Sequence, residues 1–422
     1  MGATKSAAAE WRRFWFLPGA AALGYATSVL HVYSLGPFIG ALQQDFGWSR
    51  AQISSGLTIA ALISAVGCIP VGMLVDRIGP RRVGLVGVLA MCGAFALAST
   101  ATGAMANWLA LWGVIAVGTF FVQATVWTSA VASRFEASRG LAFAITLSGA
   151  SFAAMVFPFV ATWLIGSYGW RTAYAAMGGI WAMVVFPVLF IFFRGARDGG
   201  ARPERNQVQA AQPDAQIALT GISLAAGLRT PTLYKLLLAA GLFAFTAIGV
   251  VVHFVPILTD SGATPLSAAG IAALVGVFSV IGRLGTGVLL DKFPGHVIGA
   301  IAFLIPIVAC VLLLIDGANP VNQAVAAAIF GLTVGSEVDV IAYLAAKHFG
   351  LKSFGALYGV LQMALAGGTA FGPLAAGAVF DRYDSYAPFL MLTAVLMAVS
   401  AIALFTLGPA PSRVAAVSAP AS

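Results

Sequence analysis

Charged residues are scarce in this chain. Of its 422 residues only 9% are charged, whereas 60% are hydrophobic, and the mean hydropathy is +0.96. A water-soluble domain normally carries about 25% charged residues, so this chain cannot cover a water-facing surface with charge. We therefore expect an exterior that faces lipid, and the composition excludes a soluble enzyme or a soluble binding module.

Cysteines are few, and the sequence contains no metal-binding motif. The three cysteines, Cys68, Cys92 and Cys310, lie in apolar segments without the spacing of a zinc site. A His-Glu-x-x-His motif is absent from the sequence, and no nucleophile and base stand at a recognisable spacing. The sequence therefore predicts no disulfide, no metal, no cofactor and no enzymatic activity.

Long apolar segments dominate the chain instead. A window of about 20 residues, the length of a membrane-spanning helix, finds twelve of them. They cover residues 14–40, 53–75, 83–101, 107–131, 140–165, 172–193, 233–258, 267–290, 296–315, 321–345, 355–380 and 387–407. Both faces of each segment are apolar, as expected for helices in lipid. The predicted fold is an all-α polytopic membrane protein with twelve transmembrane helices.

Positive charge is unevenly placed along the chain. The 22 Lys and Arg residues exceed the 14 Asp and Glu residues, which gives a net charge of +8. With a cytoplasmic N-terminus, most basic residues fall at the cytoplasmic face; Arg50, Arg171 and Arg382 lie on the other side, and Arg283 lies inside a span. This positive-inside bias predicts that both termini lie in the cytoplasm. The expected location is the bacterial cytoplasmic (inner) membrane. The basic charge thus reflects topology and indicates no nucleic-acid partner.

A short charged phrase occurs once in each half of the chain. Gly72-Met-Leu-Val-Asp76-Arg77-Ile-Gly79-Pro-Arg81-Arg82 lies between two apolar segments, and Gly287-Val-Leu-Leu-Asp291-Lys292-Phe293 repeats its beginning. The same offset relates Gly140 to Gly355 and Pro158 to Pro373. The repetition predicts two pseudo-symmetric halves of six helices, with a substrate site between them near the midplane. The predicted domains are 1–193, 194–231 as a cytoplasmic linker, 232–410, and 411–422 as a cytoplasmic tail.

The charged phrases also predict a gate. An Asp at a helix end beside Arg and Gly can cross-link neighbouring helices through charge contacts that must break when the cytoplasmic side opens. The predicted gating residues are Asp76, Arg77, Arg81, Arg82, Arg134, Arg139, Asp291, Lys292 and, near the outer end of the seventh helix, His253. The alternative is that the basic residues only obey the positive-inside rule and that His253 is interfacial.

Several phrases together resemble a known family. The first charged phrase is similar to the cytoplasmic loop signature of the major facilitator superfamily. More specific phrases are Leu42-Gln-Gln-Asp-Phe-Gly-Trp-Ser-Arg50, Arg134-Phe-Glu-Ala-Ser-Arg139-Gly-Leu-Ala, Tyr168-Gly-Trp-Arg171, Ile281-Gly-Arg283-Leu-Gly and Gly372-Pro-Leu-Ala-Ala-Gly. From about residue 20 to 405, the chain resembles the monocarboxylate transporter family, including its bacterial members and the oxalate/formate exchangers.

This resemblance implies proton-linked or exchange transport of small carboxylates, with an Arg in the eighth helix that binds the substrate carboxylate. Arg283 is the matching residue. The animal proton path cannot be transferred, because the first helix has no basic residue beyond its start and Ser279 stands where animal members have an Asp. Residues 354–380 contain no second cation, only the neutral Gln362, which favours a monoanion over a dicarboxylate.

Arg283 is also the most informative single residue by its own chemistry. It lies about 12 Å of helix before Asp291, and a guanidinium at that depth costs several kcal/mol without a polar cavity or partner. Its planar fork suits a carboxylate. The alternative is a structural ion pair with Glu337 or Asp339 in the tenth helix.

Glu337 and Asp339 are the predicted proton-coupling residues. Two positions apart on a helix, they point to nearly opposite sides, and we favour Asp339, on the side of Ser336 and Tyr343, as the cavity acid. A desolvated carboxyl binds a proton more readily, whereas a nearby Arg opposes this. Such a group can exchange a proton as substrate binds Arg283. The alternative role for either residue is a helix–helix contact.

Further polar and aromatic residues complete the predicted site. With Arg283, the predicted substrate-binding residues are Tyr33, Gln123, Trp127, Gln362, Tyr343 and His31. Each is equally explained as an interhelical hydrogen-bonding residue. The expected function is proton-coupled symport of small monocarboxylates by alternating access, in a monomer whose partners are substrate, protons and the bilayer. The alternatives are a carboxylate exchanger, a carrier of a larger aromatic or organic acid, and a membrane sensor.

Overall fold

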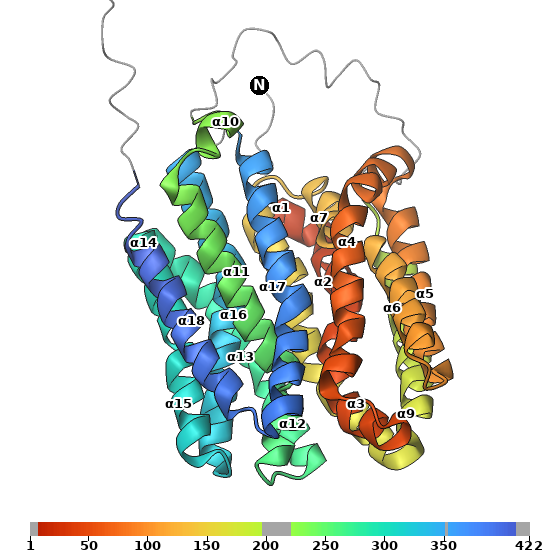
Figure 1. The fold of residues 1–422 in the computed structure, drawn as a ribbon. Coiled ribbons are helices and arrows are strands. Elements are labelled where there is room, and N and C mark those ends of the chain that lie inside the picture. The colour runs from red at the N-terminus through yellow and green to blue at the C-terminus, as the bar shows by residue number, and fades with distance from the viewer. Residues whose placement is uncertain (1–6, 196–220, 351–352, 411–422) are drawn as a thin grey trace, which may run out of the picture.

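The structure is a computed structural model that describes residues 7–195, 221–350 and 353–410, without the side chains of residues 65–73 and 76. Apart from one backbone bridge between Gly221 and Gly350, the regular structure of these residues is helical. Figure 1 shows two helical bundles side by side, one from each half of the sequence. Most of the predicted linker (196–220) and the predicted tail (411–422) lie outside the described residues.

The N-terminal half contains six spans. Its helices are α1 (Ala7–Phe14), α2 (Phe16–Ser28), α3 (Leu30–Phe46), α4 (Arg50–Ile78), α5 (Pro80–Leu97), α6 (Met105–Phe120), α7 (Ala124–Ala132), α8 (Arg139–Leu147) and α9 (Gly149–Phe192), with a 3-10 turn at Ala98–Thr100. α2 and α3 form one span, and α6 and α7 form another. α9 contains parts of two spans, because Gly169 has a φ of 79° and turns the chain.

The C-terminal half repeats this arrangement. Its helices are α10 (Leu224–Gly227), α11 (Pro231–Val252), α12 (Phe254–Asp260), α13 (Pro265–Lys292), α14 (Gly295–Leu304), α15 (Pro306–Asp316), α16 (Pro320–Phe349), α17 (Phe354–Tyr383) and α18 (Ala387–Phe405). α11 and α12 share a span, as do α14 and α15, where Pro306 removes one backbone donor.

Twelve spans follow from these helices. Among the described residues, nine segments are long and apolar enough to cross a membrane, and one of them, Arg139–Phe192, has 54 residues and holds two spans. α2 with α3, and α4, supply the other two. The predicted set of twelve transmembrane helices is therefore present, six in each half.

Five spans are divided into two helices, which hydropathy did not indicate. The breaks lie at Val29, at residues 121–123, at Ser148, at His253 and at Ile305. At Val29 the backbone N–H bonds to the carbonyl of Ala26, and the hydroxyl of Ser28 donates to the carbonyl of Tyr25 at 2.7 Å. The predicted first helix is thus two helices. Irregular backbone at this depth is tolerated where it lies inside the protein or lines a polar space.

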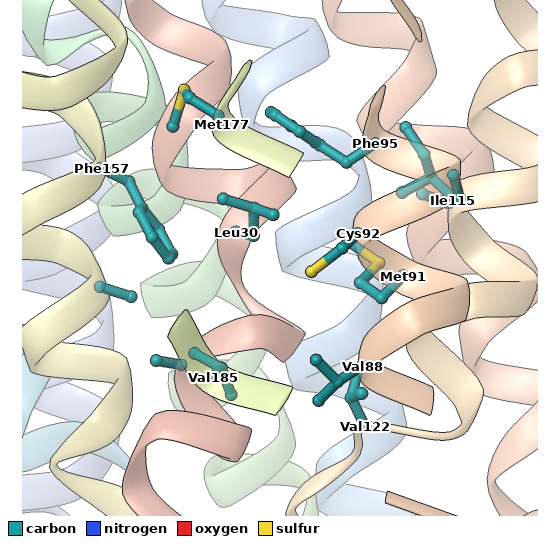
Figure 2. Close-up of a cluster of buried hydrophobic side chains, with 14 of the residues drawn as sticks. Leu30, Val88, Met91, Cys92, Phe95, Ile115, Val122, Phe157, Met177 and Val185 are labelled. Carbon is teal, nitrogen blue, oxygen red and sulfur yellow. The ribbon is translucent and has the colours of Figure 1, made fainter. Parts of the chain in front are cut away.

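A continuous apolar core holds the N-terminal half together. Leu30 of α3 lies among Met91 and Phe95 of α5 and Phe157 and Met177 of α9, all of them buried (Figure 2). Close-packed interiors resist deformation. The half is therefore expected to move as a body.

The interface between the halves has two ends. We call the end with α1, α10 and the start of α11 the linker face, and the end with the turns 47–49, 261–264 and 384–386 the far face. In Figure 1, α4 and α17 converge toward the far face, at the bottom, and separate toward the linker face. Gly377 of α17 permits this approach, because a Cβ there would lie 2.7 Å from the backbone at the start of α4.

Candidate functional site

Arg283 lies well inside α13 and is paired with Asp339 of α16. Its Nη1 is 3.3 Å from Oδ1 and 3.5 Å from Oδ2 of that carboxylate, and its side chain is 13% exposed. The Nε of Arg283 has no partner within the described residues. Both distances exceed the roughly 2.7–2.9 Å of a strong charge-assisted hydrogen bond. The guanidinium therefore keeps donor capacity for a second anion.

Small residues along the contact between α13 and α16 position the Arg283–Asp339 pair. A Cβ on Gly282 would strike the carbonyl of Leu332, and a Cβ on Gly335 would strike the carbonyl of Ser279. The two backbones therefore touch, which is the packing that small residues allow between membrane helices. The hydroxyl of Thr286 donates to that of Ser336 at 2.6 Å along the same seam. The contact fixes the depth of Arg283 against α16.

The two acids of α16 lie in different surroundings. The side chain of Asp339 is 32% exposed despite its depth, so it borders an open space. Glu337 is 5% exposed, and its Oε1 has no partner within the described residues. Asp339 is thus the more accessible acid. Glu337 is a carboxyl that the structure leaves incompletely bonded.

Three tyrosines lie within electrostatic range of Arg283. The charge of Arg283 acts on the hydroxyls of Tyr25 in α2, Tyr33 in α3 and Tyr358 in α17. Tyr33 also lies within range of Glu337, and Tyr358 within range of both acids. We call the following residues the central cluster: Arg283, Glu337, Asp339, Tyr25, Tyr33 and Tyr358. Since α2 and α3 belong to the N-terminal half, the cluster lies between the halves.

Tyr25 and Tyr358 are absent from the predicted site. Tyr358 precedes the predicted Gln362 by one helical turn, so the two share a face, and this spacing was a usable signal. Tyr25 precedes Tyr33 by two turns, but the break at Val29 between them carries no proline or glycine that would reveal it.

Trp127, a predicted substrate contact, lies in the core of the N-terminal half. Its side chain is fully buried, and its indole N–H donates to the carbonyl of Val122 at 2.8 Å. Its ring packs against Phe193 at 5.0 Å between centroids and fills the space above Gly24 and Gly84. These contacts account for the tryptophan without a ligand.

The remaining predicted contacts are spread over both halves. His31 is buried, and its Nδ1 has no partner within the described part of the chain. Tyr343 lies toward the linker face, with the ammonium of Lys347 5.4 Å from its ring centre. Gln362 is exposed on α17, and Gln123 is the residue that precedes α7. Their predicted roles stay predictions.

The predicted gating residues of the linker face contact their own half. Arg81, Arg134 and Arg139 donate to backbone carbonyls of the N-terminal half at 2.5, 2.9 and 3.1 Å. The exposed members are Arg77, Arg82, Arg139, Asp291 and Lys292. The side chain of Asp76 lies outside the described residues. Where side chains are described, no ion pair joins the halves at this face.

Arg50, the first residue of α4, joins the halves at the far face. It donates to both oxygens of Asp260 at 2.7 and 3.1 Å, and to the hydroxyl of Tyr386 at 2.8 Å. Its Nε donates to Gln43 at 3.1 Å, and its guanidinium lies 3.5 Å from the ring centre of Phe380. One N-terminal cation therefore holds three groups of the C-terminal half.

Asp381 and His253 extend this contact. The carboxylate of Asp381 accepts the N–H groups of the first two residues of α4 at 2.8 and 2.9 Å, at the positive end of that helix. The buried His253 lies 3.1 Å from the hydroxyl of Ser54 and 2.7 Å from that of Tyr386. We call the following residues the far-face lock: Arg50, Asp260, Asp381, Tyr386 and His253.

Outside the spans, α1 docks on the turn before α8. The carboxylate of Glu10 accepts N–H bonds from Ala137, Glu136 and Ser138 at 3.0, 2.9 and 3.2 Å. These bonds, that of Ala137 first, lower the pKa of Glu10 to about 2, although burial acts in the opposite direction. α1 is therefore held by an ionised carboxylate.

Comparison with known proteins agrees with this architecture. Residues 21–335 match the Major Facilitator Superfamily. Monocarboxylate transporter 13 of Rattus norvegicus is 24% identical over 372 residues, which cover 87% of this chain and 83% of that protein. A gallate transporter of Pseudomonas putida is 27% identical over 290 residues, or 62% of each chain.

A solved structure shares the fold. The crystal structure of a bacterial homologue of the human lysosomal transporter Spinster, inward-facing and unoccupied, matches with a TM-score of 0.71 and 16% identity. The match covers 93% of this chain and 96% of that one. At this identity the likeness concerns the fold, and it confirms the predicted all-α arrangement.

Proposed function

The chain belongs to the major facilitator superfamily, and we propose that it carries small monocarboxylates together with protons across the bacterial inner membrane. The predicted resemblance to this superfamily and its monocarboxylate transporters is confirmed, and such proteins are transporters rather than enzymes. The observation that carries the proposal is Arg283, a cation deep in a span that is only loosely paired with Asp339 and keeps an unused donor.

Charge balance gives the proposed coupling. In the empty protein, Arg283 and Asp339 sum to zero. A substrate carboxylate that binds Arg283 adds one negative charge, and uptake of a proton by Asp339 restores neutrality. Closing the two halves over a net charge would be costly, because a buried charge without a partner loses its hydration. One proton should therefore accompany each monocarboxylate, with Glu337 as the second acid through which it can pass.

The two faces supply the proposed gates. With a cytoplasmic linker face, this conformation is open toward the cytoplasm, and the far-face lock closes the outer side. Opening to the outside would break the bonds of Arg50 and bring the linker-face charges, among them Asp291 and Lys292, into contact across the halves. Rocking of two halves about a site between them is the usual cycle of such folds. One chain contains both halves of the site, so a monomer suffices.

Replacement of Asp339 by Asn tests the coupling. The empty variant carries the unpaired charge of Arg283 and cannot return, whereas the loaded variant is neutral. Net uptake of labelled lactate into liposomes, driven by an inward proton gradient, should fall by more than about tenfold, because an unpaired charge at this depth costs several kcal/mol. Exchange of internal for external carboxylate should persist.

Arg283→Gln serves as the comparison, because it should abolish net uptake and exchange alike while membrane insertion is unchanged. Near-normal uptake by Arg283→Gln would overturn the site, and wild-type net uptake by Asp339→Asn would overturn the coupling. Wild-type protein that only exchanges carboxylates, indifferent to the proton gradient, would establish the exchanger instead.

A second candidate is a carrier of larger aromatic acids. The observation that favours it is that three tyrosines, Tyr25, Tyr33 and Tyr358, lie within electrostatic range of Arg283. The Pseudomonas putida relative is a gallate transporter. A panel of lactate, pyruvate, formate, oxalate and benzoate separates the candidates, and oxalate should be carried poorly because Arg283 has no second cation beside it.

A further inference from the structure

Three arginines at the linker face of the N-terminal half have no acid partner. Arg12 and Arg13 lie in the last turn of α1, and Arg194 follows the end of α9; all three are exposed. No ion pair holds any of them within the described residues. Of the described acids nearby, Glu10 already accepts three backbone N–H bonds, and the exposed Glu136 pairs with none of the three. The three cations are therefore free to bind an anion from outside the chain.

Two contacts hold the end of α1 beside the end of α9. The ring of Phe16 lies 5.6 Å from that of Phe192, measured between centroids. Arg134 bridges the same two ends, because its guanidinium lies 4.9 Å from the ring centre of Phe14 and donates to the carbonyl of Gly195 at 2.9 Å. The exposed arginines that adjoin these residues in sequence therefore belong to one surface.

Exposed aromatic and apolar side chains lie on the membrane side of these arginines. Trp15 is 67% exposed and follows Arg12 by three residues with a helical backbone, so the two side chains share a face. In α9, Ile191 and Phe192 are 58% and 40% exposed just before the chain reaches Arg194. Exposed rings at the end of a span lie at the headgroup level of a bilayer, and cations just beyond them reach the lipid phosphates. The surface thus has an apolar part for acyl chains and a cationic part for a headgroup.

We propose that Arg12, Arg13 and Arg194 bind the phosphate of an anionic phospholipid in the leaflet at the linker face, with its acyl chains along Trp15 and the end of α9. We call these three residues the lipid-binding arginines. Guanidinium groups match phosphate oxygens in geometry and charge. A lipid with a net negative charge is preferred over a zwitterionic one, because the cationic part of a choline headgroup would face the three arginines. The inference does not depend on which substrate the protein carries.

The test measures lipid binding to the full chain. Native mass spectrometry of the protein titrated with phosphatidylglycerol or phosphatidylcholine should give an affinity roughly 5- to 100-fold higher for phosphatidylglycerol, because each cation near an anionic headgroup contributes up to about fivefold. Hydrogen exchange of residues 7–16 and 190–195 should be slower in nanodiscs that contain phosphatidylglycerol than in discs of phosphatidylcholine alone. Replacement of all three lipid-binding arginines by Gln should remove most of the preference and the difference in exchange.

Arg229→Gln is the matched control at the same face. Arg229 is an exposed cation between α10 and α11 of the C-terminal half, and it too has no ion pair within the described residues. This variant loses one positive charge and should keep the lipid preference and the slower exchange at both segments. In discs of phosphatidylcholine alone, all variants should unfold at the wild-type temperature, because the substituted side chains are exposed.

Four results would overturn the inference. Equal hydrogen exchange of the wild-type protein in the two kinds of disc would mean that no anionic lipid binds at these segments. A lipid preference that survives in the triple variant would place the lipid elsewhere. An equal loss in Arg229→Gln would mean a general effect of net charge. Inorganic phosphate that slows the exchange in phosphatidylcholine discs as much as phosphatidylglycerol does would mean a site for a free anion.

Discussion

The two ends of the interface between the halves use their charges differently. At the far face, Arg50 finds acceptors in the other half, and Asp381 reaches across to the start of α4. At the linker face, Arg81 and Arg139 bond to carbonyls of their own half. Both ends are charged, but among the described residues the charges join the two halves at the far face only.

Glycine contact explains which end is closed. Near the far end of α17, Gly377 touches the backbone of α4, whereas a Cβ on Gly355 or Gly359, near the other end of the same helix, would meet nothing within 4 Å. α17 therefore touches the backbone of the opposite half at Gly377, whereas Gly355 and Gly359 have no close neighbour among the described residues. At the far face, backbone contact and interhalf charge contacts occur together, whereas the described charges at the linker face bond within their own half.

The largest effect is expected from a methyl group at the closed end. Gly377→Ala puts a Cβ about 2.7 Å from the backbone at the start of α4, and backbone cannot yield as a side chain can. The far face should stay open and transport should be lost. Spin labels at Gln44→Cys and Ser267→Cys, in protein without its native cysteines, should report a longer distance across the far face.

Gly359→Ala is the control on the same helix. It enters open space and should leave the distance and the transport unchanged, with a gain in helix stability of about 1 kcal/mol or less. An equal response to both substitutions would show that α17 is equally sensitive to alanine at both positions. It would contradict the conclusion that only Gly377 needs to be small.

Two ion pairs of the far face give the next prediction. Arg50–Asp260 and Arg171–Asp45 have the same length, 2.7 Å, but the Arg50 side chain is 10% exposed and joins the halves, whereas Arg171 is 51% exposed and lies within one half. Arg50→Ala should favour the open far face by about 1–3 kcal/mol, between the values for surface and buried pairs. Arg171→Ala should change the same label distance little. Equal shifts in the two variants would mean that the far-face lock does not close the gate.

Sequence reasoning predicted the fold correctly and proposed candidate site residues for a simple physical reason. Apolar length identifies spans, and a charge such as Arg283 or Asp339 stands out inside them. Arg50 and Asp381 were not predicted as gating residues, because charges in turns are ordinary and their partners are 210 to 331 positions away.

Trp127 was predicted to contact the substrate, whereas the structure places its side chain in the core of the N-terminal half. Its face of the helix is shared with Gln123, which favoured a cavity, but two glycines of other helices form the slot that holds it in the core. A slot made by Gly24 and Gly84 exists only after the helices are packed. A single sequence therefore does not show which residues pair across helices. Nor does it show where a glycine on one helix makes room for a large side chain on another.

Removing charges at the linker face should leave the resting structure unchanged, in contrast to Arg50→Ala at the far face. Asp291→Asn combined with Lys292→Gln removes charges that are exposed in this conformation, so the resting distance between labels at Glu136→Cys and Phe293→Cys should not change. Transport should slow by roughly twofold to fivefold, because exposed ion pairs are worth up to about 1 kcal/mol and these would form only in the opposite state. A changed resting distance would show that the charges already hold this face.

The smallest effect is expected from α1, whose Glu10 bonds to the N-terminal half. The pKa of Glu10 is lowered from 4.5 to about 2, so its contribution to docking is complete above about pH 5 and is lost as the pH falls through about 2. Hydrogen exchange of the amides of Glu136, Ala137 and Ser138, corrected for intrinsic rates, should show constant protection from pH 5 to 8. Glu10→Gln should weaken that protection across the whole range and leave both label distances unchanged, because Glu10 has no bond to the other half among the described residues. A loss of wild-type protection between pH 8 and 5 would mean that a group other than Glu10 holds α1. If the protection is constant, any pH dependence of transport in that range must come from the acids between the halves.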